Sequence, residues 1–173
     1  MIIKCTSNTT DILPLLIQNY AWTQGKEDTQ VDLTTGKYYA VYAIINDDKG
    51  ERYLVHTDNS NSLRWMPSEF YEVYEAAHPT GWKEWENKGL ISYPALHNST
   101  TFYEIIDNED PGKSAYMAEV AKDSTFPSVH ELGRLNYPAI YEQKLKLAKE
   151  CGYEYPPKAY EDSNEYLEIA NYC

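Results

Sequence analysis

The sequence predicts an α+β protein in which a small, curled antiparallel β unit has flanking helices and is followed by C-terminal helices. Two observations lead to this prediction. Between residues 36 and 75, runs of β-branched and aromatic residues alternate with polar turns rich in Asp, Asn and Gly. Further along, residues 138–151 show the spacing of an amphipathic helix. The chain has 173 residues, 42% of them hydrophobic, so residues 1–173 are expected to form a single domain.

The N-terminal part of the chain predicts little regular structure. Residues 2–4 fit a short strand, and residues 11–20 weakly favour a helix with Asp11 as its N-cap and Pro14 in its first turn. The start of the chain lacks the continuous apolar run of a signal peptide, and no stretch is long enough for a membrane span. We therefore expect a cytoplasmic protein.

The β unit is expected to contain three strands, one helical turn and a last short strand. The polar turns at 46–50 and 57–62 separate the first three strands, which are residues 38–45, 51–56 and 63–66. Residues 67–70 suit a single 3₁₀ turn, and residues 71–74 a final strand. This order is SH3-like. Because so short a meander buries a core only by curling, we expect a partial barrel within residues 33–75.

Residues 76–173 are expected to form a mixed, mainly helical extension. Residues 101–106 fit either a strand or a helical turn, whereas residues 114–121 fit a helix. Residues 138–151 predict the clearest helix, because Pro138 occupies its first turn and Gly152 is placed to end it. A last helix is expected after a linker, with Asp162 or Ser163 as its cap and Tyr172 at its end.

No pattern typical of a catalytic, metal or cofactor site is present in the sequence. The glycines form neither of the phosphate-binding patterns, and the acidic run at 107–110 lacks the frame of a calcium loop. The histidines and cysteines show no metal-ligand spacing: His56, His78, His97, His130, Cys5, Cys151 and Cys173. We expect no metal, no cofactor and no enzymatic activity, although a Cys/His pair formed by distant positions stays open.

Charge favours a basic protein partner. The chain holds 27 acidic and 15 basic residues, a net charge of −12. Such a field repels phosphate backbones, so direct nucleic-acid binding is not expected, and it speeds the capture of basic proteins. Solubility alone is the alternative explanation of the charge.

Aromatic residues supply candidate anchors for that partner. The 17 tyrosines and four tryptophans carry the large side chains enriched at interfaces, although Trp65 and most tyrosines are expected in or around the core. The candidate partner-binding residues are acidic groups in turns and near the C-terminus, with two nearby tryptophans: Asp47, Asp48, Glu84, Glu86, Asp107, Glu109, Asp110, Glu161, Asp162, Glu165, Trp82 and Trp85.

Three segments carry a family resemblance: residues 33–45 (LTTGKYYAVYAII), 52–55 (RYLV) and 65–73 (WMPSEFYEV). They resemble a pattern, LTxGKxYxVYxI … YLI … WxPxxLFEI, in small bacterial proteins, some of which look like immunity proteins of polymorphic-toxin or contact-dependent growth inhibition (CDI) loci. The resemblance implies a cytosolic antitoxin that binds and occludes a toxin domain. Many such toxins are basic nucleases, whose phosphate-binding cleft an acidic protein can block by mimicking nucleic acid.

Two other functions stay open. An SH3-like adaptor or regulatory module of a bacterial or phage complex would need an aromatic groove between the turns at 46–50 and 57–62. An enzyme would need a pocket that contains two or more of the histidines or cysteines.

Overall fold

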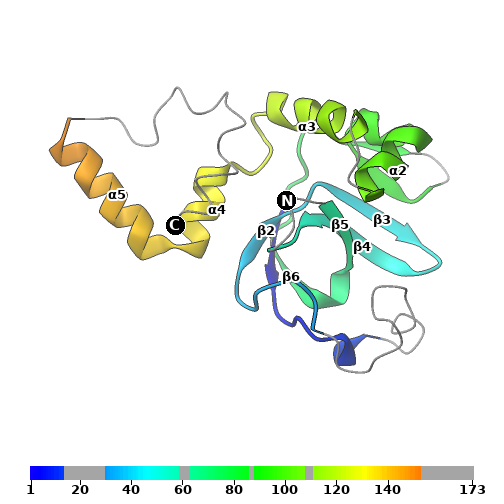
Figure 1. Cartoon of the computed structure of the whole chain (residues 1–173), viewed down its shortest axis with the longest axis horizontal. Helices are drawn as coiled ribbons and strands as arrows, with labels where there is room; N and C mark the ends of the chain where they lie inside the picture. Colours follow the sequence, from blue (N-terminus) through cyan, green and yellow to red (C-terminus); the bar gives the residue numbers. More distant parts are fainter. Residues whose placement is uncertain (14–29, 59–62, 86–87, 108–110, 153–173) are drawn as a thin grey trace. The chain divides into compact units, whose positions relative to one another are not determined.

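The computed structural model describes residues 1–13, 30–58, 63–85, 88–107 and 111–152. The chain divides into two compact units, residues 1–126 and residues 127–173, and each is described by itself. The described residues form two antiparallel sheets and four α-helices (Figure 1), which confirms the α+β class. The prediction of a single domain stays a prediction.

The first sheet has three strands and is centred on the N-terminal strand. In order across the sheet, the strands are β2 (Tyr38–Ala40), β1 (Ile2–Cys5) and β6 (Tyr71–Glu75). Ile3 of β1 lies opposite Tyr39 on one side and Val73 on the other. The expected strand at residues 2–4 is therefore confirmed, and it lies between two strands of the predicted meander.

The second sheet has five strands. In order, these are β5 (Leu63–Pro67), β4 (Gly50–His56), β3 (Ala43–Asp47), β8 (Leu90–Ser92) and β7 (Lys83–Trp85). The predicted hairpins β3–β4 and β4–β5 are confirmed. The β7–β8 hairpin extends the sheet beyond β3, where Ile45 pairs with Leu90. Among the residues described, neither sheet closes into a barrel.

The single strand predicted at residues 38–45 is wrong, because the chain changes sheets at Val41 and Tyr42. The Val41 amide donates to Met1 O at 3.2 Å, in line with the first sheet, and the Tyr42 amide donates to Leu54 O at 2.8 Å, toward the second. A continuous β-branched and aromatic run gives no sign of such a corner. The sequence predicts the 3₁₀ helix η2 (Ser68–Phe70), and in the structure this helix makes the return crossing between β5 and β6.

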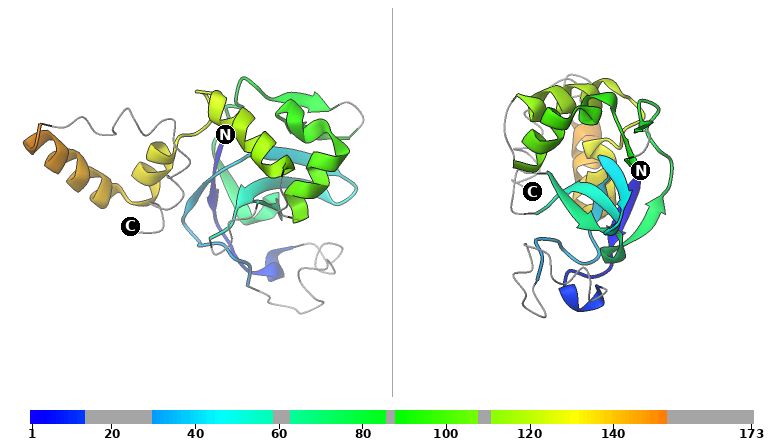
Figure 2. Two further views of the ribbon diagram at one scale, coloured as in Figure 1. Left: turned by 45° about the horizontal axis from the view of Figure 1, so that its top comes forward. Right: turned by 90° about the vertical axis from the view of Figure 1, so that its right-hand side faces the viewer.

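Helices cover the five-stranded sheet in the first unit. They are η3 (Pro94–His97), α2 (Ser99–Asp107) and α3 (Gly112–Lys122), and α2 and α3 lie side by side over the strands (Figures 1 and 2). Residues 101–106 are thus helical. The Tyr116 hydroxyl of α3 donates to Tyr42 O at 2.5 Å, and the rings of Phe102 and Trp65 lie 5.9 Å apart. These contacts fix the helices on the sheet.

The core lies inside the first unit. Fully buried side chains come from both sheets and from α3, among them Ile3, Leu54, Phe70 and Tyr116. Asp123 ties the end of α3 to the turn before β7. Its carboxylate accepts hydrogen bonds from the Gly81 amide at 2.8 Å and the Tyr93 hydroxyl at 3.1 Å. Burial raises the pKa of Asp123, but hydrogen bonds from Thr125, Gly81 and Tyr93 outweigh it and lower the pKa to about 2.

The second unit contains two helices, α4 (Val129–Asn136) and α5 (Pro138–Glu150), and neither has a buried residue. The α5 helix confirms the prediction: Pro138 lies in its first turn, and Gly152 follows its end with φ of 75°. The predicted helix at residues 11–20 is observed only as the 3₁₀ helix η1 (Thr10–Ile12), since residues 14–29 lie outside the described part. The last predicted helix lies outside it as well. Within the described ranges, no helix has the length and apolarity to cross a membrane.

Candidate functional site

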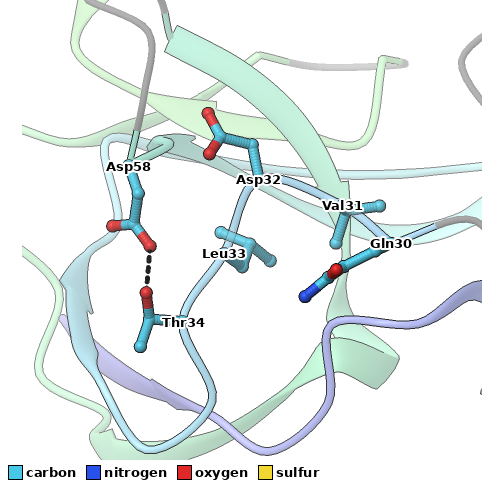
Figure 3. Close-up of a pocket in the computed structure, with 6 residues that line it drawn as sticks. All are labelled: Gln30, Val31, Asp32, Leu33, Thr34 and Asp58. Atoms are coloured by element: carbon cyan, nitrogen blue, oxygen red, sulfur yellow. Dashed lines mark hydrogen bonds between the residues drawn. The ribbon is translucent and has the colours of Figure 1, made fainter.

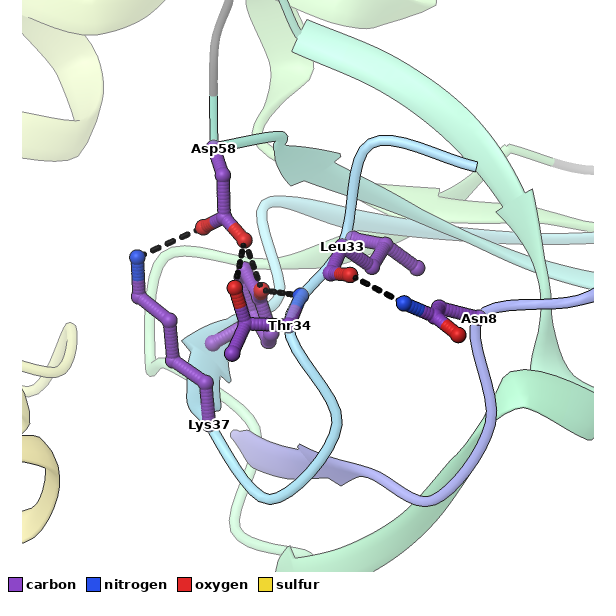
Figure 4. A network of polar contacts seen from close by, with 6 residues as sticks. Asn8, Leu33, Thr34, Lys37 and Asp58 are labelled. Atoms are coloured by element: carbon purple, nitrogen blue, oxygen red, sulfur yellow. Dashed lines mark hydrogen bonds and ion pairs between the residues drawn. The ribbon is translucent and has the colours of Figure 1, made fainter. Parts of the chain in front are cut away.

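A polar network centred on Asp58 lies beside an open pocket in the first unit. The Asp58 carboxylate binds three side chains: Lys37 Nζ at 2.5 Å, Thr34 Oγ1 at 2.6 Å and the Tyr39 hydroxyl at 2.9 Å. Figure 4 shows the carboxylate between Lys37 and Thr34. The partners precede Asp58 by 19 to 24 residues, so the network joins distant parts of the chain.

Backbone hydrogen bonds hold the two segments of the site together. Asp58 follows β4, and its amide donates to Asp32 O at 3.1 Å. Asn8 fixes the segment before β2 from the other side, because its Nδ2 donates to Leu33 O at 2.9 Å and its carbonyl accepts from the Val31 amide at 2.8 Å. These bonds hold the segment in place although it lies outside any sheet.

The pocket has a volume of about 460 Å³ and opens to solvent (Figure 3). Its lining is polar and carries two carboxylates: Gln30, Val31, Asp32, Leu33, Thr34 and Asp58. Figure 3 shows Asp58 and Thr34 on one side, Gln30 and Val31 on the other, and Asp32 between them. Its described lining consists of carboxylate, amide, hydroxyl and aliphatic side chains, which suit hydrogen bonding and ion pairing with a cationic or donor group.

The hydrogen bonds keep Asp58 ionised. Burial raises the pKa of its carboxyl, but the bonds from Lys37, Thr34 and Tyr39 outweigh this effect and hold the pKa below its usual value. Conversely, burial and the neighbouring Asp58 carboxylate raise the pKa of Tyr39, so this hydroxyl stays a donor. Asp58 is paired with Lys37, and Asp32 is the second carboxylate that lines the pocket.

Four of the predicted partner-binding residues lie near one end of the five-stranded sheet. The Asn46 amide donates to Gly89 O at 2.8 Å, which places the turn of Asp47 and Asp48 beside the hairpin of Glu84 and Trp85. This end is not uniformly acidic. Asp47 pairs with Arg52 at 2.5 Å, and three lysines belong to the same two hairpins: Lys49, Lys83 and Lys88.

The two predicted tryptophan anchors have different surroundings. Trp82 is only 7% exposed and belongs to the core, so it does not form the surface anchor that the sequence suggests; its ring lies 6.5 Å from that of Tyr93. Trp85 is half-buried and stacks on His97, with ring centroids 5.6 Å apart and planes at 11°. A tryptophan surrounded by charged residues in the sequence can still point inward from a short strand.

The other predicted residues cannot be placed at a surface. Asp107 ends α2, and its side chain lies outside the described part. The rest also lie outside it: Glu86, Glu109, Asp110, Glu161, Asp162 and Glu165. Residues 59–62 also lie outside the described part. The aromatic groove expected between the turns at 46–50 and 57–62 therefore stays a prediction.

The histidines lie on separate elements: His56 on β4, His78 before β7, His97 on η3 and His130 on α4. In the described part of the chain, no three His, Cys, Asp or Glu residues are grouped so that they could hold a metal ion. Cys5 is buried, and burial raises the pKa of its thiol to about 11.

Sequence reasoning did not identify the Asp58 network. Asp58 stands in a polar turn after a strand, and Asp32 precedes the LTTGK segment, so both look like ordinary turn residues. The network depends on the fold bringing the carboxylate of Asp58 next to Lys37. The spacing of these two residues along the chain does not indicate that they meet.

Comparison of the chain with protein-family models, with curated proteins and with solved structures gives no significant match. The resemblance of residues 33–73 to immunity proteins therefore stays a prediction.

Proposed function

We propose that this protein is an immunity protein that binds a basic toxin domain and neutralises it by protein–protein contact. One observation carries the proposal: an open pocket with two carboxylates, one of them held ionised by three hydrogen bonds, in a chain with a net charge of −12. Such a pocket suits an arginine or lysine side chain of a partner. The overall charge favours fast capture of that partner.

The sequence resemblance supports the same proposal from a different direction. Its three segments supply β2 to β6, and the pocket is formed by the residues just before β2 and just after β4. We further propose that β1 to β6 form an SH3-like partial barrel. The corner at Val41 and Tyr42 and the 3₁₀ helix before β6 support this, since both carry the chain between two small sheets.

Asp32→Asn tests the pocket. The test measures binding of the purified protein to the product of the neighbouring gene by calorimetry. We expect the variant to bind about tenfold more weakly, because one carboxylate facing a basic group is lost. Asp58 is a poorer choice, since its loss also removes the bonds that hold the pocket together.

Glu142→Gln is the control, because Glu142 is an exposed carboxylate on α5 that is not among the predicted partner-binding residues, and its loss changes the net charge equally. It should leave the affinity within about twofold. Raising the salt concentration should weaken wild-type binding. Equal losses of affinity in the two variants would count against the pocket as the binding site. An affinity that changes with neither substitution nor with salt would count against the electrostatic mechanism.

An adaptor function is the second candidate. The observation that favours it is the pair of Tyr38 and Tyr74, whose rings meet at 4.9 Å, with Tyr74 55% exposed beside the glutamates of β6. Aromatic rings beside acidic side chains suit a short peptide. Truncation of the partner discriminates the two functions: an adaptor retains its affinity for a short linear peptide, whereas an immunity protein requires the folded toxin domain.

A further inference from the structure

The β6 strand is exposed far more than a strand of a small sheet usually is. Glu72, Val73, Tyr74 and Glu75 are all exposed, so side chains on both faces of the strand reach solvent over this stretch. Val73 is 48% exposed and Tyr74 55%. In an antiparallel sheet one face normally packs on the core. Exposure of consecutive residues therefore sets β6 apart from the core strands.

The outer edge of β6 is open as well. Among the strands that the structure describes, β6 pairs with β1 alone and forms one border of the three-stranded sheet. An edge strand directs alternate backbone N–H and C=O groups away from its neighbour, and these groups form a template for another strand. The register with β1 shifts at Tyr74, and the Tyr71 amide already donates to Ser68 O, so the regular template runs from the Tyr71 carbonyl to Val73.

The side chains around this edge are acidic and aromatic. Glu69, Glu72 and Glu75 lie on or just before β6, and the nearby cation Lys4 is 3.4 Å from Glu72. The rings of Tyr74 and Tyr38 meet edge to face at 4.9 Å, and Lys4 Nζ lies 5.8 Å from the Tyr38 ring centre. This surface already binds one lysine through a carboxylate and an aromatic ring.

The charges select among possible occupants. A second copy pairing through its own β6 would bring the glutamates of both chains together, and like charges facing each other across strands destabilise the pair. A basic segment instead places its cations beside those glutamates. The edge thus disfavours self-association and suits a partner of opposite charge.

We propose that β6 is a docking edge for an extended, basic peptide segment of a partner protein, which adds a fourth strand to the three-stranded sheet. Backbone hydrogen bonds along Tyr71 to Val73 supply the pairing, and lysine or arginine side chains lie beside Glu72 and Glu75. This surface is distinct from the Asp58 pocket and does not depend on it.

A short synthetic peptide in which lysine alternates with valine and threonine serves as the probe. Binding to the full chain is followed by amide NMR shifts and hydrogen exchange. We expect shifts and slowed exchange at residues 71–75. A peptide N-methylated at alternate amides should bind about tenfold more weakly, because it cannot donate along one edge. A peptide with glutamate in place of lysine should not bind.

Glu75→Lys should weaken binding of the lysine peptide about tenfold, since it reverses one charge at the edge. Glu84→Lys is the matched control, because Glu84 is also an exposed glutamate on a border strand, β7 of the other sheet. Asp32→Asn should leave peptide binding unchanged, which separates this proposal from the pocket.

Four results would overturn the proposal: no protection at residues 71–75, equal binding of the N-methylated peptide, an equal loss in Glu84→Lys, or a dimer that light scattering detects and that Glu75→Lys alters. The last result would identify a second copy as the occupant.

Discussion

His56 ends β4 with its ring edge-on to Tyr42, the ring centroids being 5.2 Å apart. Its Nε2 is buried and has no hydrogen-bond partner among the described residues. Burial, with a smaller contribution from the charge of Lys113, lowers the pKa of His56 from 6.5 to about 4. The folded state thus favours the neutral ring, whereas the unfolded chain takes up a proton below pH 6.5.

The stabilisation by neutral His56 is therefore complete above pH 6.5 and is lost as the pH falls toward 4. Between pH 7 and pH 5 the free energy of unfolding should decrease by about 2 kcal/mol through this group. Urea unfolding at the two pH values measures it. His56→Gln should lose most of that difference, and His78→Gln, at an exposed position, should retain it. If His56→Gln shows the same decrease in unfolding free energy between pH 7 and pH 5 as the wild type, His56 is not the group responsible.

Gly89 is held between β7 and β8 by both its conformation and its surroundings. Its φ is +60°, and a Cβ at this position would lie 2.0 Å from Asn46 O. Gly89→Ala should lower the free energy of unfolding by more than about 2 kcal/mol, because the backbone of β3 has to move.

Gly36 provides the matched control for Gly89. Its φ is +88°, but a Cβ there would meet nothing within 4 Å. Gly36→Ala should cost only the conformational strain, about 1 kcal/mol. Urea unfolding gives the loss of unfolding free energy in each variant, and the difference between the two losses is the contribution of the clash. Equal losses would show that close packing against Asn46 is not important.

At the scale of elements, the sequence predicts best where a local signal stands alone. Pro138 and Gly152 delimit α5, and the polar turns delimit β4, so these boundaries follow from single residues. The corner at Val41 and Tyr42 was not predictable in this way. Its hydrogen-bond acceptors are Met1 O, just before β1, and Leu54 O in β4, and neither is a local neighbour in the sequence. Tertiary pairing decides there which sheet each residue joins.

The candidate site illustrates the same limit. Acidic residues in turns are easy to find in a chain with 27 acidic residues, but their partners are not. Asp47 pairs with Arg52 five residues away, whereas Asp58 binds Thr34 and Lys37 from before β2 and Tyr39 from β2 itself. Only the fold distinguishes a carboxylate in a pocket from one in an exposed turn. Trp82 shows the converse case, since its burial depends on packing against Tyr93.

At the scale of the whole molecule, burial is unevenly distributed between the two units. The described core cluster lies entirely between Met1 and Val120, whereas α4 and α5 contain no buried residue. Residues 1–126 hold 19 acidic and 10 basic residues, and residues 127–173 hold 8 and 5. The first unit therefore carries most of the negative charge together with the Asp58 pocket and β6.

A chain truncated after Phe126 should consequently fold on its own. Because α4 and α5 contribute nothing to the described core, its free energy of unfolding should lie within about 1 kcal/mol of that of the full chain, as measured by urea unfolding followed by tryptophan fluorescence. Trp65, Trp82 and Trp85 all report from this unit. The truncated chain should also retain binding of the basic peptide. Loss of cooperative unfolding would show that residues 127–173 complete the core, and loss of peptide binding in a folded fragment would show that they contribute to the docking surface.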